Sequence, residues 1–178
     1  MLLVTRDGKI LDPSLYTFEN NIFTSDESYL TISCYVDGVT FNTRSHCTFN
    51  AQSHCIFNTR SYCVFNTQSY CIFNTWNHCT FSTLSYCNFN TGSYCNFKTD
   101  ASCNFNTKSN CVFMVKFECA FKTASYCVLL YESDKTYREF LDDGYFIIKK
   151  SKGFIPIEVE LFEVMETMAL FENEKGER

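Results

Sequence analysis

The chain has 178 residues, of which 46% are hydrophobic, and it contains 12 cysteines and 19 phenylalanines. This apolar content can build a core, so the composition excludes a disordered chain, and no apolar stretch reaches the length of a signal peptide or a membrane span. The net charge of −5 is uneven: residues 39–128 carry six basic and two acidic side chains, and the acidic excess lies towards the ends. Because the sequence shows neither a signal peptide nor a membrane span, we expect a cytoplasmic protein whose cysteines remain thiols.

Residues 1–38 precede the regular part of the sequence and are predicted to cap it. Apolar residues at 2–4 and 9–11 flank an Arg6-Asp7-Gly8 turn, which is the pattern of a small β-hairpin. Residues 31–36 still alternate between apolar and polar side chains, but they do not match the consensus of the repeat that follows. A cap is expected because the open end of a stacked β-structure exposes unpaired strand edges, which invite aggregation.

Residues 39–130 form an octapeptide repeat. A cysteine recurs at every eighth position from Cys47 to Cys127, and the chain around it reads Cys-x-Phe-Asn-Thr-x-Ser-x, as in residues 63–70. A strict period indicates one structural unit that has been copied and stacked. Alternation with period two predicts a short strand in each unit, with Cys and Phe pointing inward. The core ladder predicted in this way contains Cys47, Cys55, Cys63, Cys71, Cys79, Cys87, Phe49, Phe57, Phe65, Phe73, Phe81 and Phe89.

One octad is too short to close a turn of a solenoid, so the number of octads per coil has to be inferred. Two octads give a flattened coil of sixteen residues with two parallel sheets face to face, and three octads give a triangular coil. The residue between Thr and Ser favours two, because Arg44 and Arg60, and likewise Gln52 and Gln68, are sixteen positions apart. Facing strands then run in opposite directions, which predicts a cysteine opposite each phenylalanine. The corner falls at Thr-x-Ser, where Gly92 would supply a positive φ.

Residues 131–178 are predicted to form a small α+β cap. A hairpin is expected from strands at 145–148 and 154–157, joined by a turn at 149–153. Five apolar residues at helical spacing, Val164 among them, indicate an amphipathic helix over about residues 159–172. This helix would pack on the rod or pair with a second copy. The candidate oligomerisation residues of such a homodimer are Leu161, Met165, Met168 and Phe171.

The octad resembles the Cys/Phe octapeptide-repeat proteins, most of them uncharacterised, that occur in bacteriophage and bacterial genomes. The resemblance covers about half of the chain. Typical members have glycine after the threonine more regularly than this chain, which has Arg44, Arg60 and Trp76 there. The repeat is more loosely similar to pentapeptide-repeat solenoids, but the different period prevents any transfer from residue to residue. The resemblance implies a parallel β-solenoid of phage or bacterial origin.

The pattern predicts neither a metal site nor a cofactor. Adjacent residues of a strand point to opposite faces, so the histidines of His46-Cys47, His54-Cys55 and His78-Cys79 do not share a face with their cysteines. No Cys-x2–4-Cys pair, the spacing typical of zinc sites, is present. Cysteines sixteen residues apart would be close enough for disulfides, but their parallel side chains favour free thiols.

The candidate partner-binding surface is centred on Trp76, the only tryptophan. A coil of sixteen residues places it beside Arg60 and Arg44, and exposed Trp with Arg is typical of binding hot spots. The outward tyrosines are further candidates, with an aromatic ladder that only stabilises the sheet as the alternative. These tyrosines are Tyr62, Tyr70, Tyr86 and Tyr94.

The sequence predicts a non-enzymatic binding or scaffold protein that acts on a protein partner. A phage-encoded modulator of a host protein would fit this prediction, and a virion component or a small-ligand sequestering protein are the alternatives. Six dispersed basic residues between acidic ends argue against nucleic acid as the partner.

Overall fold

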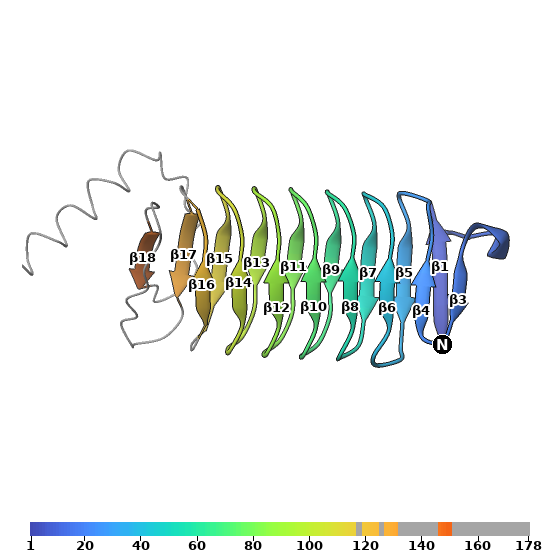
Figure 1. Ribbon diagram of the computed structural model, residues 1–178, viewed down its shortest axis with the longest axis horizontal. Coiled ribbons are helices and arrows are strands. Elements are labelled where there is room, and N and C mark those ends of the chain that lie inside the picture. The colour runs from blue at the N-terminus through green and yellow to red at the C-terminus, as the bar shows by residue number, and fades with distance from the viewer. Residues whose placement is uncertain (117–118, 125–126, 132–145, 151–178) are drawn as a thin grey trace, which may run out of the picture.

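The computed structural model describes residues 1–116, 119–124, 127–131 and 146–150. They form an elongated parallel β-solenoid, in which short strands stack along one axis (Figure 1). The elements in chain order are β1 (Leu2–Arg6), β2 (Lys9–Ile10), the 3-10 turn η1 (Pro13–Leu15), β3 (Thr17–Glu19), β4 (Ile22–Thr24), β5 (Thr31–Cys34), β6 (Thr40–Asn42), β7 (Thr48–Ala51), β8 (Ile56–Asn58), β9 (Val64–Asn66), β10 (Ile72–Asn74), β11 (Thr80–Ser82), β12 (Asn88–Asn90), β13 (Asn96–Lys98), β14 (Asn104–Asn106), β15 (Val112–Val115), β16 (Ala120–Lys122), β17 (Cys127–Tyr131) and β18 (Phe146–Lys150).

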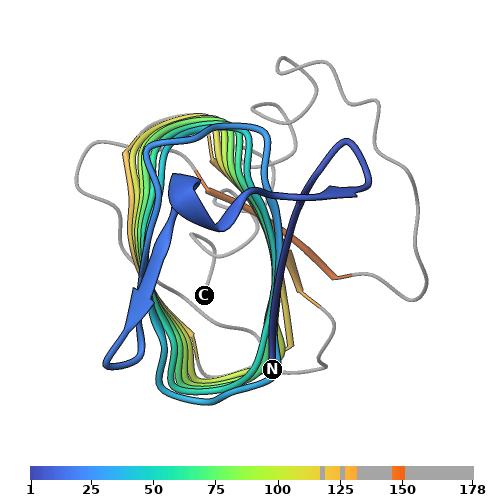
Figure 2. The same ribbon diagram turned by 90° about the vertical axis from the view of Figure 1, so that its right-hand side faces the viewer.

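Successive octads alternate between two facing sheets. The ten-stranded sheet has the order β18-β17-β15-β13-β11-β9-β7-β5-β1-β2, and the eight-stranded sheet has the order β16-β14-β12-β10-β8-β6-β4-β3. Each repeat strand pairs in parallel with the strand sixteen residues away, so Phe73 lies between Phe57 and Phe89. The coil of two octads is therefore confirmed, and the triangular coil of three is excluded. Figure 2 shows the flattened outline of the stacked coils.

The core is a zipper of phenylalanine rings. Phe65 stacks on Phe49 and Phe81 of its own sheet, with centroids 5.1 and 4.9 Å apart. It also meets Phe57 and Phe73 of the facing sheet edge to face, with centroids 5.2 Å apart. The prediction of a cysteine opposite each phenylalanine is wrong. The strands from β8 to β14 are only three residues long with Phe in the middle. The middles of facing strands therefore meet, and the cysteines lie at the ends of the core.

Cysteine and threonine fill the core at each corner. Thr67 and Cys71, four residues further on, are both buried there. The Cys71 Sγ lies 3.4 Å from the carbonyl oxygen of Gln52 and 3.5 Å from that of Ser69. A small buried side chain with a weak S–H donor suits this place, because these corner carbonyls turn away from water.

The corner turns through a positive φ at the residue before each cysteine from Cys47 to Cys111. His46, Tyr62, Tyr70 and Tyr86 have φ between 59° and 61°. The prediction that Gly92 supplies the positive φ is wrong, because the positive φ falls two positions later, at Tyr94. The left-handed residue points its N–H along the rod axis, and the Tyr62 N–H donates to the Asn77 carbonyl of the next coil at 3.1 Å. The twist of the corner therefore serves the backbone bonds between coils.

The N-terminal end is closed by antiparallel strands. β1 and β2 form a hairpin through Asp7 and Gly8, which both have positive φ, as a two-residue type I′ turn requires. β1 then pairs antiparallel with β5, and β3 pairs antiparallel with β4. The solenoid itself begins before residue 39, since β4 and β5 already pair in parallel with β6 and β7.

Only part of the predicted C-terminal cap falls on described residues. β18 pairs in parallel with β17, and it includes Lys149 and Lys150, which the sequence placed in a turn. The second strand of the expected hairpin and the expected helix with Leu161, Met165, Met168 and Phe171 lie outside the described residues. In the part of the chain that the structure describes, no helix has the length and apolarity needed to cross a membrane.

Candidate functional site

Two rows of corners run along opposite edges of the rod. We call the row formed by residues 43–46, 59–62, 75–78, 91–94 and 107–110 the Trp76 edge. The row formed by residues 51–54, 67–70, 83–86 and 99–102 is the Leu84 edge. Because equivalent residues are sixteen positions apart, side chains from successive coils stand next to one another along each edge.

Each edge carries a column of stacked aromatic rings. On the Trp76 edge, ring centroids are 4.5 to 4.9 Å apart along the series Tyr29, His46, Tyr62, His78 and Tyr94. On the Leu84 edge, His54, Tyr70 and Tyr86 stack with centroids 5.0 Å apart. The four candidate tyrosines therefore do not form one surface, because Tyr62 and Tyr94 lie on one edge and Tyr70 and Tyr86 on the other.

A ring within a column has a neighbour on both faces. Tyr62 lies between His46 and His78, with interplanar angles of 1° and 2°. Its faces are thus closed to a planar ligand, and its hydroxyl and ring edge reach the surface. Left-handed backbone costs about 1 kcal/mol for a residue with a Cβ, and stacking of the rings opposes this cost. The columns are thereby explained as part of the fold. This is the alternative in which the aromatic ladder stabilises the sheet and does not bind a partner.

The Trp76 edge is basic. Its five corner segments contain Arg44, Arg60 and Lys108 and no acidic residue. Arg44 pairs with Asp26 at 2.9 Å, whereas Arg60 and Lys108 form no ion pair with a described residue. The Arg60 guanidinium lies over the Trp76 ring, 5.6 Å from its centroid, and Trp76 is 61% exposed. The structure thus places Arg60 and Trp76 side by side, as a coil of sixteen residues predicts.

A hollow of about 390 Å³ lies beside Trp76. Gly92 follows Trp76 in the next coil and Lys108 follows Gly92; their backbones are joined by hydrogen bonds of 3.1 and 3.3 Å. Gly92 has no side chain, and the Asn77 carboxamide lies where its Cβ would be. The row along the edge therefore has a gap, floored by Asn77, between the indole and the lysine. The hollow is lined by Thr75, Trp76, Asn77, Asn90, Thr91, Gly92, Asn106, Thr107 and Lys108.

Sequence reasoning missed Lys108 and this gap. The signal was present in the row of residues between Thr and Ser, which reads Arg44, Arg60, Trp76, Gly92 and Lys108 at a spacing of sixteen. A glycine between Thr and Ser suggests a turn residue first, but in a row of long side chains it also indicates a position without a side chain.

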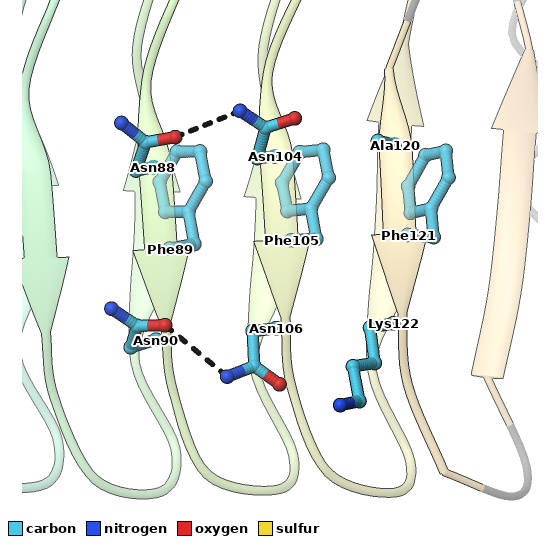
Figure 3. A pocket seen from close by; sticks show the side chains of 9 residues that line it. All are labelled: Asn88, Phe89, Asn90, Asn104, Phe105, Asn106, Ala120, Phe121 and Lys122. Carbon is cyan, nitrogen blue, oxygen red and sulfur yellow. Dashed lines mark hydrogen bonds between the residues drawn. The ribbon is translucent and has the colours of Figure 1, made fainter.

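A second hollow, of about 440 Å³, lies on the outer face of the eight-stranded sheet. Figure 3 shows its two asparagine rows: Asn104 Nδ2 donates to Asn88 Oδ1 at 2.9 Å, and Asn106 Nδ2 donates to Asn90 Oδ1 at 3.3 Å. Lys122 stands at the end of one row. The amides bond one another along the rod, and the rings in the lining, Phe89, Phe105 and Phe121, belong to the core or pack against it. The lining contains no carboxylate.

The cysteines lie in the core, where a substrate does not reach them directly. All twelve are free and buried. Hydrogen bonding to the Cys103 thiol, with a contribution from burial, raises the pKa of the Cys87 thiol well above its usual range. A protonated buried thiol is a weak nucleophile. Among the described residues, no group of three or more His, Cys, Asp or Glu side chains is arranged to hold a metal ion.

Comparison of the chain with protein-family models, with curated proteins and with solved structures finds no match. The candidate site therefore has to be interpreted from its own chemistry. Its features are a rigid rod, one basic edge, an exposed indole held by an arginine, and a gap beside that indole.

Proposed function

We propose that the protein is a non-enzymatic scaffold that binds a protein partner through the Trp76 edge. The observation that carries the proposal is the contact between Arg60 and the exposed ring of Trp76. Tryptophan and arginine are the residues most enriched at binding hot spots, because they combine a large contact area with directional polar groups. A tryptophan that only covered a corner would not need to be 61% exposed.

The charge of the edge selects the class of partner. Arg60 and Lys108 are exposed and form no ion pair with a described residue, and the corner segments of the edge contain no carboxylate. Complementary charge steers association and suppresses partners of the same sign. An acidic protein surface is therefore the expected partner. The resemblance of the octad to phage-encoded repeat proteins makes a bacterial host protein the first one to test.

The stiffness of the rod supports a scaffold. Phenylalanine rings interlock from Phe23 to Phe121, with a stacked neighbour along each sheet and an edge-to-face neighbour across the core through the repeat. Side chains along the edge are thus held at a fixed spacing before the partner arrives, which lowers the entropic cost of binding.

Site-specific photo-crosslinking tests the proposal. A crosslinking residue at Thr80 follows the Trp76 edge, and one at Ile72 holds the same place in the preceding octad but follows the Leu84 edge. We expect the Thr80 probe to capture an acidic protein from a bacterial lysate, and the Ile72 probe to capture much less of it. Trp76→Ala and Arg60→Glu should each abolish the difference. Equal capture at the two positions, or capture that both substitutions leave unchanged, would contradict the proposal.

A further inference from the structure

The gap at Gly92 leaves one face of the Trp76 indole open. Arg60, one coil towards the N-terminus, covers the other face. The face away from Arg60 looks towards the coil of Gly92 and lines the hollow, whose lining also includes the Asn77 carboxamide at the Cβ site of Gly92. Trp76 has no contact with another aromatic ring within the described chain. This distinguishes Trp76 from the tyrosines and histidines inside the two columns, whose faces are covered by neighbours.

The size of the gap fits a single planar group. Trp76 and Lys108 are two coils apart, which corresponds to about 9.6 Å between their backbones at about 4.8 Å per strand. A ring at contact distance, roughly 3.5–4 Å from each wall, occupies about 7–8 Å. The Asn77 carboxamide occupies the inner part of this space, at the Cβ site of Gly92. Beyond it, one flat side chain fits between the indole and the lysine stem, and two do not.

The walls of the gap favour an aromatic group next to a carboxylate. The indole offers a stacking surface, and Lys108 offers a cation that forms no ion pair with a described residue. Asn90 and Asn106 at the rim share one hydrogen bond with each other, at 3.3 Å. A carboxamide has two N–H groups and two lone pairs, so each retains capacity to bond a peptide group.

We propose that this gap receives an aromatic side chain of an extended acidic segment, whose acidic residue two positions along pairs with Lys108. This inference rests on the proposed function and names the feature of the partner that the edge would recognise. In an extended chain, residues two apart point to the same side and are separated by about 6.6–6.8 Å. That distance lies within the combined reach of the lysine and a glutamate when the ring stacks over Gly92.

The segment can be tested without knowledge of the partner. Trp76 is the only tryptophan, so its fluorescence reports directly on the gap. The probe is the peptide acetyl-Gly-Phe-Gly-Glu-Gly-amide, titrated to millimolar concentration. We expect a saturable change in Trp76 emission, and a loss of affinity of about tenfold or more when Leu replaces Phe or Gln replaces Glu in the peptide. A peptide with Leu that binds as tightly as the parent would overturn the stacking role.

Three protein variants separate the gap from the edge as a whole. Lys108→Gln should weaken the parent peptide but leave the Gln-containing peptide unchanged, because only the former carries the charge. Asn77→Ser combined with Gly92→Gln fills the gap with the residues that the repeat has at Ser69 and Gln68, and it should abolish binding while the protein stays folded. Leu84→Gln on the opposite edge is the matched control, and it should change nothing.

The outcomes distinguish the two proposals. Absence of a saturable response at millimolar peptide, or tighter binding of a single-stranded oligonucleotide than of the peptide, would overturn the present inference. If crosslinking from Thr80 still depended on Trp76 in that case, the proposed function would stand without it. Binding of the peptide together with edge-independent crosslinking would instead overturn the proposed function alone.

Discussion

The carboxamide of Asn77 occupies the space that a side chain at Gly92 would need. Asn77 Oδ1 accepts a hydrogen bond from the Ser93 N–H at 2.9 Å and lies well inside contact distance of an added Cβ at Gly92. Other octads have Ser at the Asn77 position, as at Ser61, whose shorter side chain accepts from the Asn77 N–H at 3.2 Å. Asparagine at one corner and glycine at the next are therefore a coupled pair.

Because of this coupling, Gly92→Ala should destabilise the protein by about 1–3 kcal/mol. The shorter side chain of Asn77→Ser should restore most of the loss in the double variant, giving a coupling free energy of about 1 kcal/mol or more. The measurement is guanidinium unfolding of the two single variants and the double variant. Leu84→Ala, at the equivalent position of the other edge, is the control and should cost less than about 0.5 kcal/mol beyond its lost burial. Additive effects of the two substitutions would contradict the coupling.

Ser102 occupies a left-handed corner without the compensation that the aromatic residues have. Its φ is 54°, and it follows Tyr86 in its row without a ring to extend the column. Ser102→Gly should therefore stabilise the protein by about 0.5–1 kcal/mol, since glycine adopts positive φ without steric cost. Thermal unfolding would measure the gain. Ser93→Gly, at a position without positive φ, should be destabilising.

The same substitution at Tyr70 tests the role of stacking. Tyr70 has φ of 60° and stacks on both His54 and Tyr86. Relief of backbone strain is then opposed by the loss of two ring contacts, so Tyr70→Gly should gain less stability than Ser102→Gly. An equal gain at both positions would mean that the aromatic columns contribute nothing to the free energy of unfolding.

The thiol ladder predicts a loss of stability at alkaline pH. Hydrogen bonding to the Cys103 thiol is the largest of the effects that raise the pKa of Cys87 in the folded state, followed by the Cys71 thiol and burial. A thiol whose pKa is higher in the folded than in the unfolded state contributes to the free energy of unfolding. This contribution is complete below the unfolded pKa of about 8.5 and is lost as the pH rises above it.

Urea unfolding between pH 7 and pH 10.5 should thus show stability that falls above about pH 8.5. In Cys87→Ala the slope in this range should be shallower by about one proton per molecule, or about 1.4 kcal/mol per pH unit. Tyr62 and the other exposed tyrosines are present in both proteins and cancel in the comparison. An identical slope in the two proteins would show that the Cys87 thiol ionises equally well in the folded state.

Most of the fold can be predicted from the consensus sequence of the octad. Burial of Cys and Phe follows from their shared parity, and the Arg44/Arg60 and Gln52/Gln68 pairs gave the coil of sixteen residues. The Phe-to-Phe contact across the core did not follow from parity alone, since it depends on strands of three residues centred on Phe. The start of each strand depends on the corner geometry. There the predicted position of the positive φ, Gly92, differs from the observed one, the residue before the cysteine.

The candidate site was predictable only in part. The pairing of Trp76 with Arg60 follows from their residue types and their spacing of sixteen. The tyrosines cannot be grouped by residue type alone, because the corners of successive octads alternate between the two edges. Left-handed Tyr62 could not be expected from propensity, because a bulky side chain disfavours positive φ. The stacked rings and the N–H bond to the next coil override that preference, and both are properties of the assembled rod.

Every row of side chains along the rod depends on the coil of sixteen residues, so the most direct test is a pair of engineered disulfides. Exposed positions are used, because their side chains can turn towards each other, whereas the native cysteines are fixed in the core. Asn58 and Asn74 are outward neighbours on adjacent strands, with an amide hydrogen bond of 2.9 Å between them. Their Cα atoms, about 4.8 Å apart, are within the range that a disulfide spans. Mild oxidation of Asn58→Cys/Asn74→Cys, followed by mass spectrometry of the peptides, should give a bond between positions 58 and 74. Asn58→Cys/Ser82→Cys, with a spacing of twenty-four, should give none. A bond at twenty-four and none at sixteen would contradict the two-octad coil, and with it the row of Arg60, Trp76, Gly92 and Lys108.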